Sequence, residues 1–147
     1  MSTMAQEIPQ HLSIVTIGAH DFSELRRFYQ QWGWQLTESS ADYDDWCAFD
    51  MNGCLLSIYP LDLLGHEAAP GQEAPVNEWR GITFAITLSS EDELKRAYEA
   101  ALAAGATSVS APTKREWGGT SGYVADPEGT RWELAIGGPN PAPPRLR

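Results

Sequence analysis

The chain has 147 residues, of which 42% are hydrophobic and 20% charged, and its 20 acidic and 10 basic side chains give a net charge of -10. This length suits one compact domain. The acidity and the scattered Lys and Arg argue against nucleic acid as a partner. No apolar run reaches the roughly 18 to 20 residues that cross a bilayer, and the first residues lack the features of a secretory signal, so we expect a cytoplasmic protein without a membrane partner.

The first part of the chain predicts a strand, a helix and three further strands. Residues 12–18 form an apolar run rich in β-branched side chains, which is typical of a buried strand. From Asp21, which can cap a helix, apolar side chains recur at steps of three and four residues as far as Gly33. An Asn-Gly pair between the last two strands is a strong hairpin signal. The three strands after the helix are predicted at residues 35–38, 46–50 and 54–59.

The same order of elements returns in the second part of the chain. A strand at residues 82–88 precedes a helix that starts at a Ser-Glu capping box and ends at Gly105. The three strands that follow are predicted at residues 107–109, 122–126 and 130–136. Residues 60–79 show no clear periodicity and are interpreted as a linker, and residues 137–147 form a Pro-rich tail that should be irregular.

The repeat also has a register. Aligning Val15 with Ile82 gives an offset of 67 between the first strands, and aligning Asp50 with Asp126 gives an offset of 76 between two Asp-x-x-Gly turns. Repeats of this kind indicate duplicated structural units. We therefore predict an α+β fold of two βαβββ modules. The predicted boundaries are an N-terminal extension at 1–11, modules at 12–59 and 80–136, and one domain that spans 12–136.

Two segments resemble the vicinal oxygen chelate superfamily, which includes glyoxalase I, bleomycin-resistance proteins, fosfomycin-resistance enzymes and extradiol dioxygenases. One is VTIGAHDFSELRRFYQQWGW at residues 15–34, and the other is GYVADPEGTRWEL at residues 122–134, with the family's D-P-x-G-x-x-W-E ending. The resemblance implies paired βαβββ modules whose strands form a curved, mixed-sheet cup around a small-molecule site. It also implies a homodimer.

Members of this family that carry out chemistry hold a divalent metal with His, Gln or Glu from the first and last strands of each module. The positions in this sequence that correspond to those ligands are Ile14, Ser57, Gly81 and Glu133. Only Glu133 is a good ligand, and one carboxylate does not hold a catalytic metal against water. We therefore expect no metal and no cofactor. A divalent metal whose site is completed by substrate, by His11 or by His66 is the alternative.

Strand alternation nominates residues that face the cup. If Glu133 faces inward, so does Arg131, whereas Trp132 and Leu134 face the helices. Trp117 stands beside Gly118 and Gly119, where absent side chains would let a flat ligand approach the indole. The candidate ligand-binding residues are Trp117, Ser57, Tyr59, Trp46, Phe49, Tyr123 and Arg131.

Two functions stay open at this point. An acidic cup with aromatic walls suits the binding of a small aromatic or cationic organic molecule without chemistry, as the resemblance to bleomycin-resistance proteins implies. The alternative is a lyase, isomerase or dioxygenase that depends on a metal or on Glu133 as general base. A non-catalytic partner of another protein is a third interpretation, for which a large exposed apolar patch would be the sign.

Overall fold

The structure is a computed structural model that describes residues 8–75 and 78–137. The predicted Pro-rich tail, apart from Gly137, lies outside the described residues. Among the described residues, no helix combines the length and the apolar character that crossing a membrane requires. The elements in chain order are β1 (Ile14–Ala19), α1 (Phe22–Trp32), the 3-10 helix η2 (Glu38–Asp42), β2 (Cys47–Asp50), β3 (Leu55–Pro60), α2 (Leu61–Ala68), β4 (Thr83–Thr87), α3 (Glu91–Ala104), β5 (Thr107–Lys114), β6 (Thr120–Ala125) and β7 (Arg131–Ile136).

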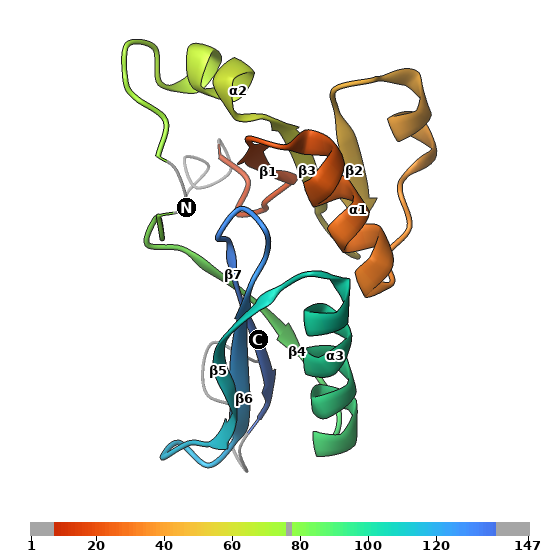
Figure 1. The fold of residues 1–147 in the computed structure, drawn as a ribbon, viewed down its shortest axis with the longest axis vertical. Helices are drawn as coiled ribbons and strands as arrows, with labels where there is room; N and C mark the ends of the chain where they lie inside the picture. The colour runs from red at the N-terminus through yellow and green to blue at the C-terminus, as the bar shows by residue number, and fades with distance from the viewer. Residues whose placement is uncertain (1–7, 76–77, 138–147) are drawn as a thin grey trace, which may run out of the picture.

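Each module contributes one sheet. The strand orders are β1-β3-β2 and β4-β7-β6-β5, and in both sheets the first strand of the module pairs in parallel with the last. Helices α1 and α3 lie on the same side of the two sheets (Figure 1). We call the side that α1 and α3 cover the helix face of each sheet and the opposite side the open face. The predicted α+β fold of two βαβββ modules is confirmed.

The two long helices begin and end in the same way. The side chains of Asp21 and Ser90 each accept a hydrogen bond of 3.0 Å from the backbone N–H three residues further on. This satisfies one of the donors that a helix N-terminus leaves unpaired. Gly33 and Gly105 end the helices with φ angles of 123° and 121°, a region that favours glycine. The predicted caps are therefore confirmed in both modules.

The strand predicted at residues 35–38 is wrong. Only an isolated bridge between Leu36 and Phe49 remains, and the chain then turns into η2. Ser40 occupies the edge of β2 instead, because its hydroxyl accepts from the Ala48 N–H at 2.9 Å and donates to the Ala48 carbonyl at 3.3 Å. The Ser40 side chain thus replaces a backbone acceptor for the Ala48 N–H, whereas the Ala48 carbonyl also accepts from the Thr37 backbone N–H at 2.9 Å.

Strand β5 is longer than predicted, since it continues to Lys114 instead of ending at residue 109. Its pairing with β6 shifts register after Ser108 and again after Ser110. Pro112 lies in this strand and lacks the N–H that a regular ladder needs. Because of these irregularities, apolar and polar side chains do not alternate regularly along β5, and the sequence pattern did not predict its second half.

The segment interpreted as a linker contains helix α2, which the sequence analysis missed. Leu61 and Leu64 of this helix lie over Gly18 on the open face of β1. A Cβ atom at Gly18 would lie 2.5 Å from Leu61 Cδ1 and 3.2 Å from the Leu61 Cα. Helix α2 therefore sits on the first sheet on the side opposite α1, and glycine at position 18 permits the close approach.

Gly18→Ala should displace α2 and lower the free energy of unfolding by roughly 1–3 kcal/mol, because the added methyl group overlaps backbone and side-chain atoms of Leu61. Gly65→Ala is the matched control, since a Cβ there has no neighbour within 4 Å. That change, inside α2, should be neutral or slightly stabilising. Urea unfolding of both variants checks this, and equal effects would contradict the packing of α2 on β1.

The register corrects one of the two repeat offsets. Thr16 of the first strand pairs with Ser57 of the last strand in the first sheet, and Ala85 pairs with Glu133 in the same way in the second sheet. Since Ser57 and Glu133 correspond at the offset of 76, Thr16 and Ala85 correspond at an offset of 69 (85 minus 16). The helix caps give the same number (90 minus 21). The predicted offset of 67 is therefore wrong by two, and the counterpart of Ile14 is Thr83, not Gly81.

The two modules share one hydrophobic core. Trp132 of β7 lies against the rings of α1 and of the chain after it, with centroid distances of 5.7 Å to Trp32 and 5.4 Å to Trp34. Trp34 in turn stacks on Tyr29 at 5.2 Å. Across the helices, the Trp32 indole N–H donates to the Ala97 carbonyl of α3 at 3.0 Å. The prediction that Trp132 faces the helices is confirmed, and Trp32 and Trp34 pack with it in the core.

The Asp-Pro-Glu-Gly turn between β6 and β7 ties the second module to α1. Asp126 is buried, and one of its carboxylate oxygens accepts from the backbone N–H groups of Glu128 and Thr130 at 2.9 Å each. Its other oxygen accepts from the hydroxyl of Tyr29, to which the Trp132 indole N–H donates at 2.9 Å. The geometry of the turn and the contact between the modules thus depend on the same carboxylate.

Candidate functional site

The open face of the second sheet carries the predicted catalytic residue. Glu133 is half-buried on β7, with Ala85 of β4 and Tyr123 of β6 as its neighbours across the strands. Trp132 and Leu134 point to the helix face and are buried, as the alternation predicts. Arg131 shares the side of Glu133 but donates to the Gly129 carbonyl at 2.7 Å. In the part of the chain that the structure describes, Glu133 forms no ion pair with an arginine.

The residues at the centre of the first sheet's open face are buried. Ser57 is 0% exposed, and its hydroxyl lies 2.7 Å from that of Thr16 on the neighbouring strand. Ala48 of β2, which pairs with Ser57 on the other side, is also buried. Ser57 is therefore a structural residue in this chain, and a ligand does not reach it.

The residues present do not fit the family's divalent metal. Ile14 carries no donor atom, the Ser57 hydroxyl is buried against Thr16, and the corrected fourth position holds the hydroxyl of Thr83. Glu133 alone supplies a strong donor. Within residues 8–75 and 78–137, no three His, Cys, Asp or Glu side chains gather as a metal site would need. His11 and His66, considered as substitutes, are both exposed.

Two other candidates lie away from any shared site. Phe49 is 1% exposed and contacts Tyr29 and Trp34 in the core. Trp117 lies in the β5–β6 hairpin turn, at the end of the molecule opposite β2 and β3 (Figure 1). A Cβ at Gly119 would lie 2.0 Å from the Trp117 ring, so the indole itself fills the space that the glycine leaves. This corrects the expectation that a ligand uses that space.

The structure brings Trp46 and Tyr59 together with two residues that the sequence analysis did not nominate. Tyr43, Asp45, Trp46 and Tyr59 line an open cavity of about 340 Å³, which we call the Trp46 site. The rings of Tyr43 and Trp46 meet edge to face at a centroid distance of 5.4 Å and an angle of 75°. Tyr59 belongs to β3 and shares the open face with Ser57, two residues earlier. Loop and strand thus supply the two walls of the site.

Carboxylates lie near the Trp46 site. The Tyr59 hydroxyl donates to Glu67 of α2 at 3.5 Å. Desolvation, followed by the negative charges of Glu67, Asp45 and Asp62, raises the pKa of Tyr59 above its usual value. None of the four lining residues is basic. The arrangement offers aromatic faces and negative potential at the same point, which is the environment that organic cations prefer.

Sequence reasoning missed Tyr43 and Asp45 because they lie in a loop, where no periodicity assigns a direction to a side chain. The run Tyr-Asp-Asp-Trp at residues 43–46 was the available signal, since it places two aromatic rings beside two carboxylates. Glu67 was missed for a different reason, because helix α2 was not predicted.

Comparisons with known proteins agree with this fold. A high-resolution structure of a glyoxalase-related enzyme from Fulvimarina pelagi is 26% identical, with a TM-score of 0.77, covering 87% of this chain and 88% of that one. A glyoxalase/bleomycin resistance protein/dioxygenase family enzyme from Burkholderia phytofirmans PsJN is 21% identical, with a TM-score of 0.70 and coverage of 86% and 98%. A lactoylglutathione lyase from Agrobacterium tumefaciens is 16% identical, with a TM-score of 0.66 and coverage of 88% and 96%. These last two likenesses show the fold alone.

No curated protein sequence matches the chain. The sequence profile described as Glyoxalase/Bleomycin resistance protein/Dioxygenase superfamily, in contrast, matches residues 11–134 and thus both modules. This chain belongs to the glyoxalase/bleomycin resistance protein/dioxygenase superfamily.

Proposed function

We propose that this protein binds a small organic cation, such as a quaternary ammonium compound, at the Trp46 site. The observation that carries the proposal is the grouping of three aromatic side chains and a carboxylate around one cavity of about 340 Å³. A cavity of this size takes a small organic molecule. The proposal needs no metal and no chemical step.

Two physical effects favour a cation at this site. The faces of Trp and Tyr rings attract a cation with about 0.5–1 kcal/mol at exposed sites and about 2 kcal/mol when the cation is desolvated. Asp45 lines the cavity, and Glu67 and Asp62 lie close enough to affect Tyr59. The net charge of -10 adds a long-range attraction and repels anions.

Choline is a suitable probe because it carries a quaternary ammonium group. We expect Trp46→Leu to weaken choline binding at least about fivefold, since loss of one cation–π contact costs about 1 kcal/mol. Asp45→Asn should weaken it about two- to fivefold at low salt, where charge interactions are least screened. Isothermal titration calorimetry measures both effects.

Trp117→Leu and Asp50→Asn are the matched controls. Each makes the same chemical change at an exposed position outside the Trp46 site. Choline affinity should stay unchanged in both. A loss in Trp117→Leu with none in Trp46→Leu would move the binding site to the β5–β6 hairpin and contradict the proposal.

The enzyme alternative makes a different prediction. A metal-dependent lyase, isomerase or dioxygenase should purify with one tightly held divalent ion per chain, and Glu133→Ala should lose that ion because Glu133 is the one strong donor among the family's ligand positions. We expect substoichiometric metal in both proteins, measured by elemental analysis after dialysis. Stoichiometric metal that depends on Glu133 would overturn the binding proposal in favour of the enzyme.

The homodimer that the family resemblance implies and the cytoplasmic location both stay predictions.

A binding protein of this kind would sequester its ligand unchanged. Product analysis after incubation with a bound cation should therefore return the cation itself.

A further inference from the structure

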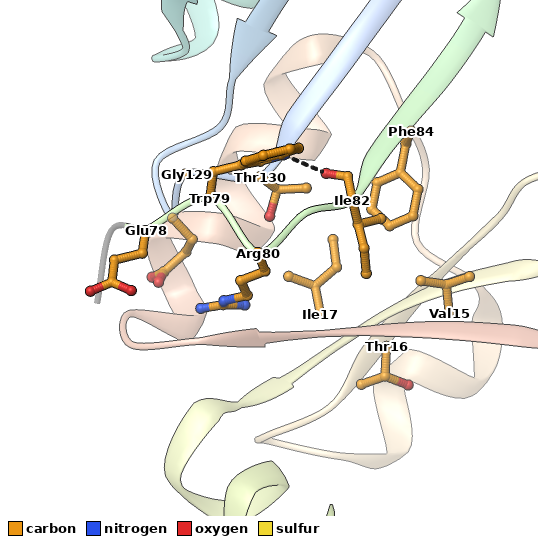
Figure 2. Close-up of a pocket in the computed structure, with 11 residues that line it drawn as sticks. Val15, Thr16, Ile17, Glu78, Trp79, Arg80, Ile82, Phe84, Gly129 and Thr130 are labelled. Carbon is orange, nitrogen blue, oxygen red and sulfur yellow. Dashed lines mark hydrogen bonds between the residues drawn. The ribbon is translucent and has the colours of Figure 1, made fainter. Parts of the chain in front are cut away.

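A second cavity lies between the two modules and shares no residue with the Trp46 site. It has a volume of about 120 Å³. Figure 2 shows Val15 and Ile17 of β1 directed toward Ile82 and Phe84, while Thr16 between them points away. We call this space the intermodule cavity. Its other lining residues are Thr16, Glu78, Trp79, Arg80, Glu128, Gly129 and Thr130.

Val15, Ile17, Ile82 and Phe84 give the intermodule cavity an apolar side, and the charged side chains that line it are Glu78, Arg80 and the buried Glu128. Glu128 is only 7% exposed. One of its oxygens, Oε2, accepts from the Asp21 backbone N–H at the start of α1, at 2.9 Å. Among the described residues, no donor reaches the other oxygen, Oε1. A buried carboxylate oxygen without a donor is costly, so this atom calls for a partner that the protein does not supply.

The size of the cavity limits that partner. An engineered apolar cavity of about 150 Å³ accommodates one benzene molecule, so a space of about 120 Å³ matches one ring. We propose that the intermodule cavity binds a neutral, ring-sized apolar molecule with a single hydrogen-bond donor, of the phenol class, and that the donor binds the free oxygen of Glu128. The proposal is independent of the proposed function.

Arg80 is the competing partner for Glu128, since both residues line the cavity. Arg80 is exposed, and no ion pair within 4.0 Å joins it to Glu128 in the part of the chain that the structure describes. The Trp79 indole N–H donates to the Ile82 carbonyl at 3.1 Å and is therefore engaged at the mouth of the cavity (Figure 2). This leaves Oε1 of Glu128 open to a donor from outside the chain.

The test compares phenol with toluene, which has nearly the same shape but no donor. Both are titrated into the ¹⁵N-labelled full chain and followed by two-dimensional NMR. Phenol should shift the backbone signals of Gly129 and Thr130 and the indole signal of Trp79. It should bind at least about tenfold more tightly than toluene, because it adds a hydrogen bond to a carboxylate. Equal affinities, or no shift at these three residues, would overturn the proposal.

Two variants locate the binding. Glu128→Gln keeps an acceptor for the Asp21 N–H but replaces the carboxylate in the cavity with a neutral amide, so the preference for phenol over toluene should fall, because a hydrogen bond to a carboxylate is stronger than one to an amide. Ile82→Trp adds bulk at the exposed edge of the cavity and should abolish the binding of both compounds. Val109→Trp is the control, since Val109 is also exposed on a strand but lies on β5, outside the cavity.

The remaining outcomes also decide the question. Phenol binding that persists unchanged in Ile82→Trp, or shifts confined to the Trp46 site, would contradict an intermodule site. If Glu128→Gln does not fold, Ile82→Trp and Val109→Trp still decide the location, and the comparison of phenol with toluene on the unmodified chain still decides the role of the donor. An absence of binding to the unmodified chain would indicate that Arg80 or water satisfies Glu128.

Discussion

Replacing Asp126 with alanine should lower the free energy of unfolding by roughly 3 kcal/mol or more. The substitution removes the acceptor of three donors, which are the backbone N–H groups of Glu128 and Thr130 and the hydroxyl of Tyr29. Each buried donor left without a partner costs about 1–3 kcal/mol. Because Tyr29 belongs to α1 and Asp126 to the β6–β7 turn, the loss also weakens the contact between the modules. Urea unfolding measures the change.

The internal repeat supplies a matched control for this prediction. Asp50 occupies the equivalent place in the first module, 76 residues earlier. Its carboxylate is exposed and accepts one hydrogen bond, from the Asn52 N–H at 2.9 Å. Asp50→Ala should therefore cost less than about 1 kcal/mol. Similar losses of unfolding free energy in Asp126→Ala and Asp50→Ala would show that the buried hydrogen bonds of Asp126 add no stability beyond that of an exposed turn.

The same carboxyl group predicts a pH dependence. Burial raises the pKa of Asp126 above its usual value of 3.8, although hydrogen bonds from Tyr29, Thr130 and Glu128 act in the opposite direction. The folded state therefore holds the proton more tightly than the unfolded state does. The part of the stability that comes from this tighter proton binding is full below pH 3.8 and is lost as the pH rises through the raised pKa, whereas the hydrogen bonds that the Asp126 oxygens accept remain. The stability advantage of the unmodified chain over Asp126→Asn should shrink over that interval, and an advantage that grows would contradict the assigned cause.

Trp132→Ala is the second large prediction, with an expected loss of roughly 3–5 kcal/mol. Trp132 is 3% exposed and packs against Trp32, Trp34 and Phe84, and its indole N–H donates to the Tyr29 hydroxyl. The truncation leaves a cavity at the point where the modules meet and removes a donor. Trp132→Phe keeps most of the ring and should cost less.

Trp79→Ala is the control for the Trp132 variants, because Trp79 is 58% exposed and makes one hydrogen bond through its ring. Its substitution should change the free energy of unfolding by less than about 1 kcal/mol. Comparable losses for Trp79 and Trp132 would mean that the shared aromatic core does not hold the modules together.

The sequence was most informative where one physical rule determined one feature. Helix caps at Asp21 and Ser90 could be predicted because few residue types satisfy a free N–H at a helix start. The direction of Trp132 on β7 could be predicted because side chains alternate along a strand. The fold class followed from a third regularity, the repeated order of elements.

Prediction failed where a long-range contact overrides local pattern. The strand expected at residues 35–38 is displaced by the bonds of Ser40 to Ala48, and α2 depends on its packing over Gly18. The offset of 67 between the first strands came from aligning similar apolar residues, whereas the strand pairing shows an offset of 69. Trp46 and Tyr59 were nominated as ligand-binding residues and stay predictions in that role, whereas Tyr43 and Asp45, which line the same cavity, come from a loop that follows no period.

The most direct test of cation binding at the Trp46 site is a comparison of two ligands that differ only in charge. Choline and 3,3-dimethylbutan-1-ol have the same shape, because a neutral carbon replaces the quaternary nitrogen in the second compound. Titrated calorimetrically into the unmodified chain at low salt, choline should bind at least about tenfold more tightly, since cation–π contact and nearby carboxylates both act on its charge. Equal affinities, or tighter binding of the neutral alcohol, would contradict the account.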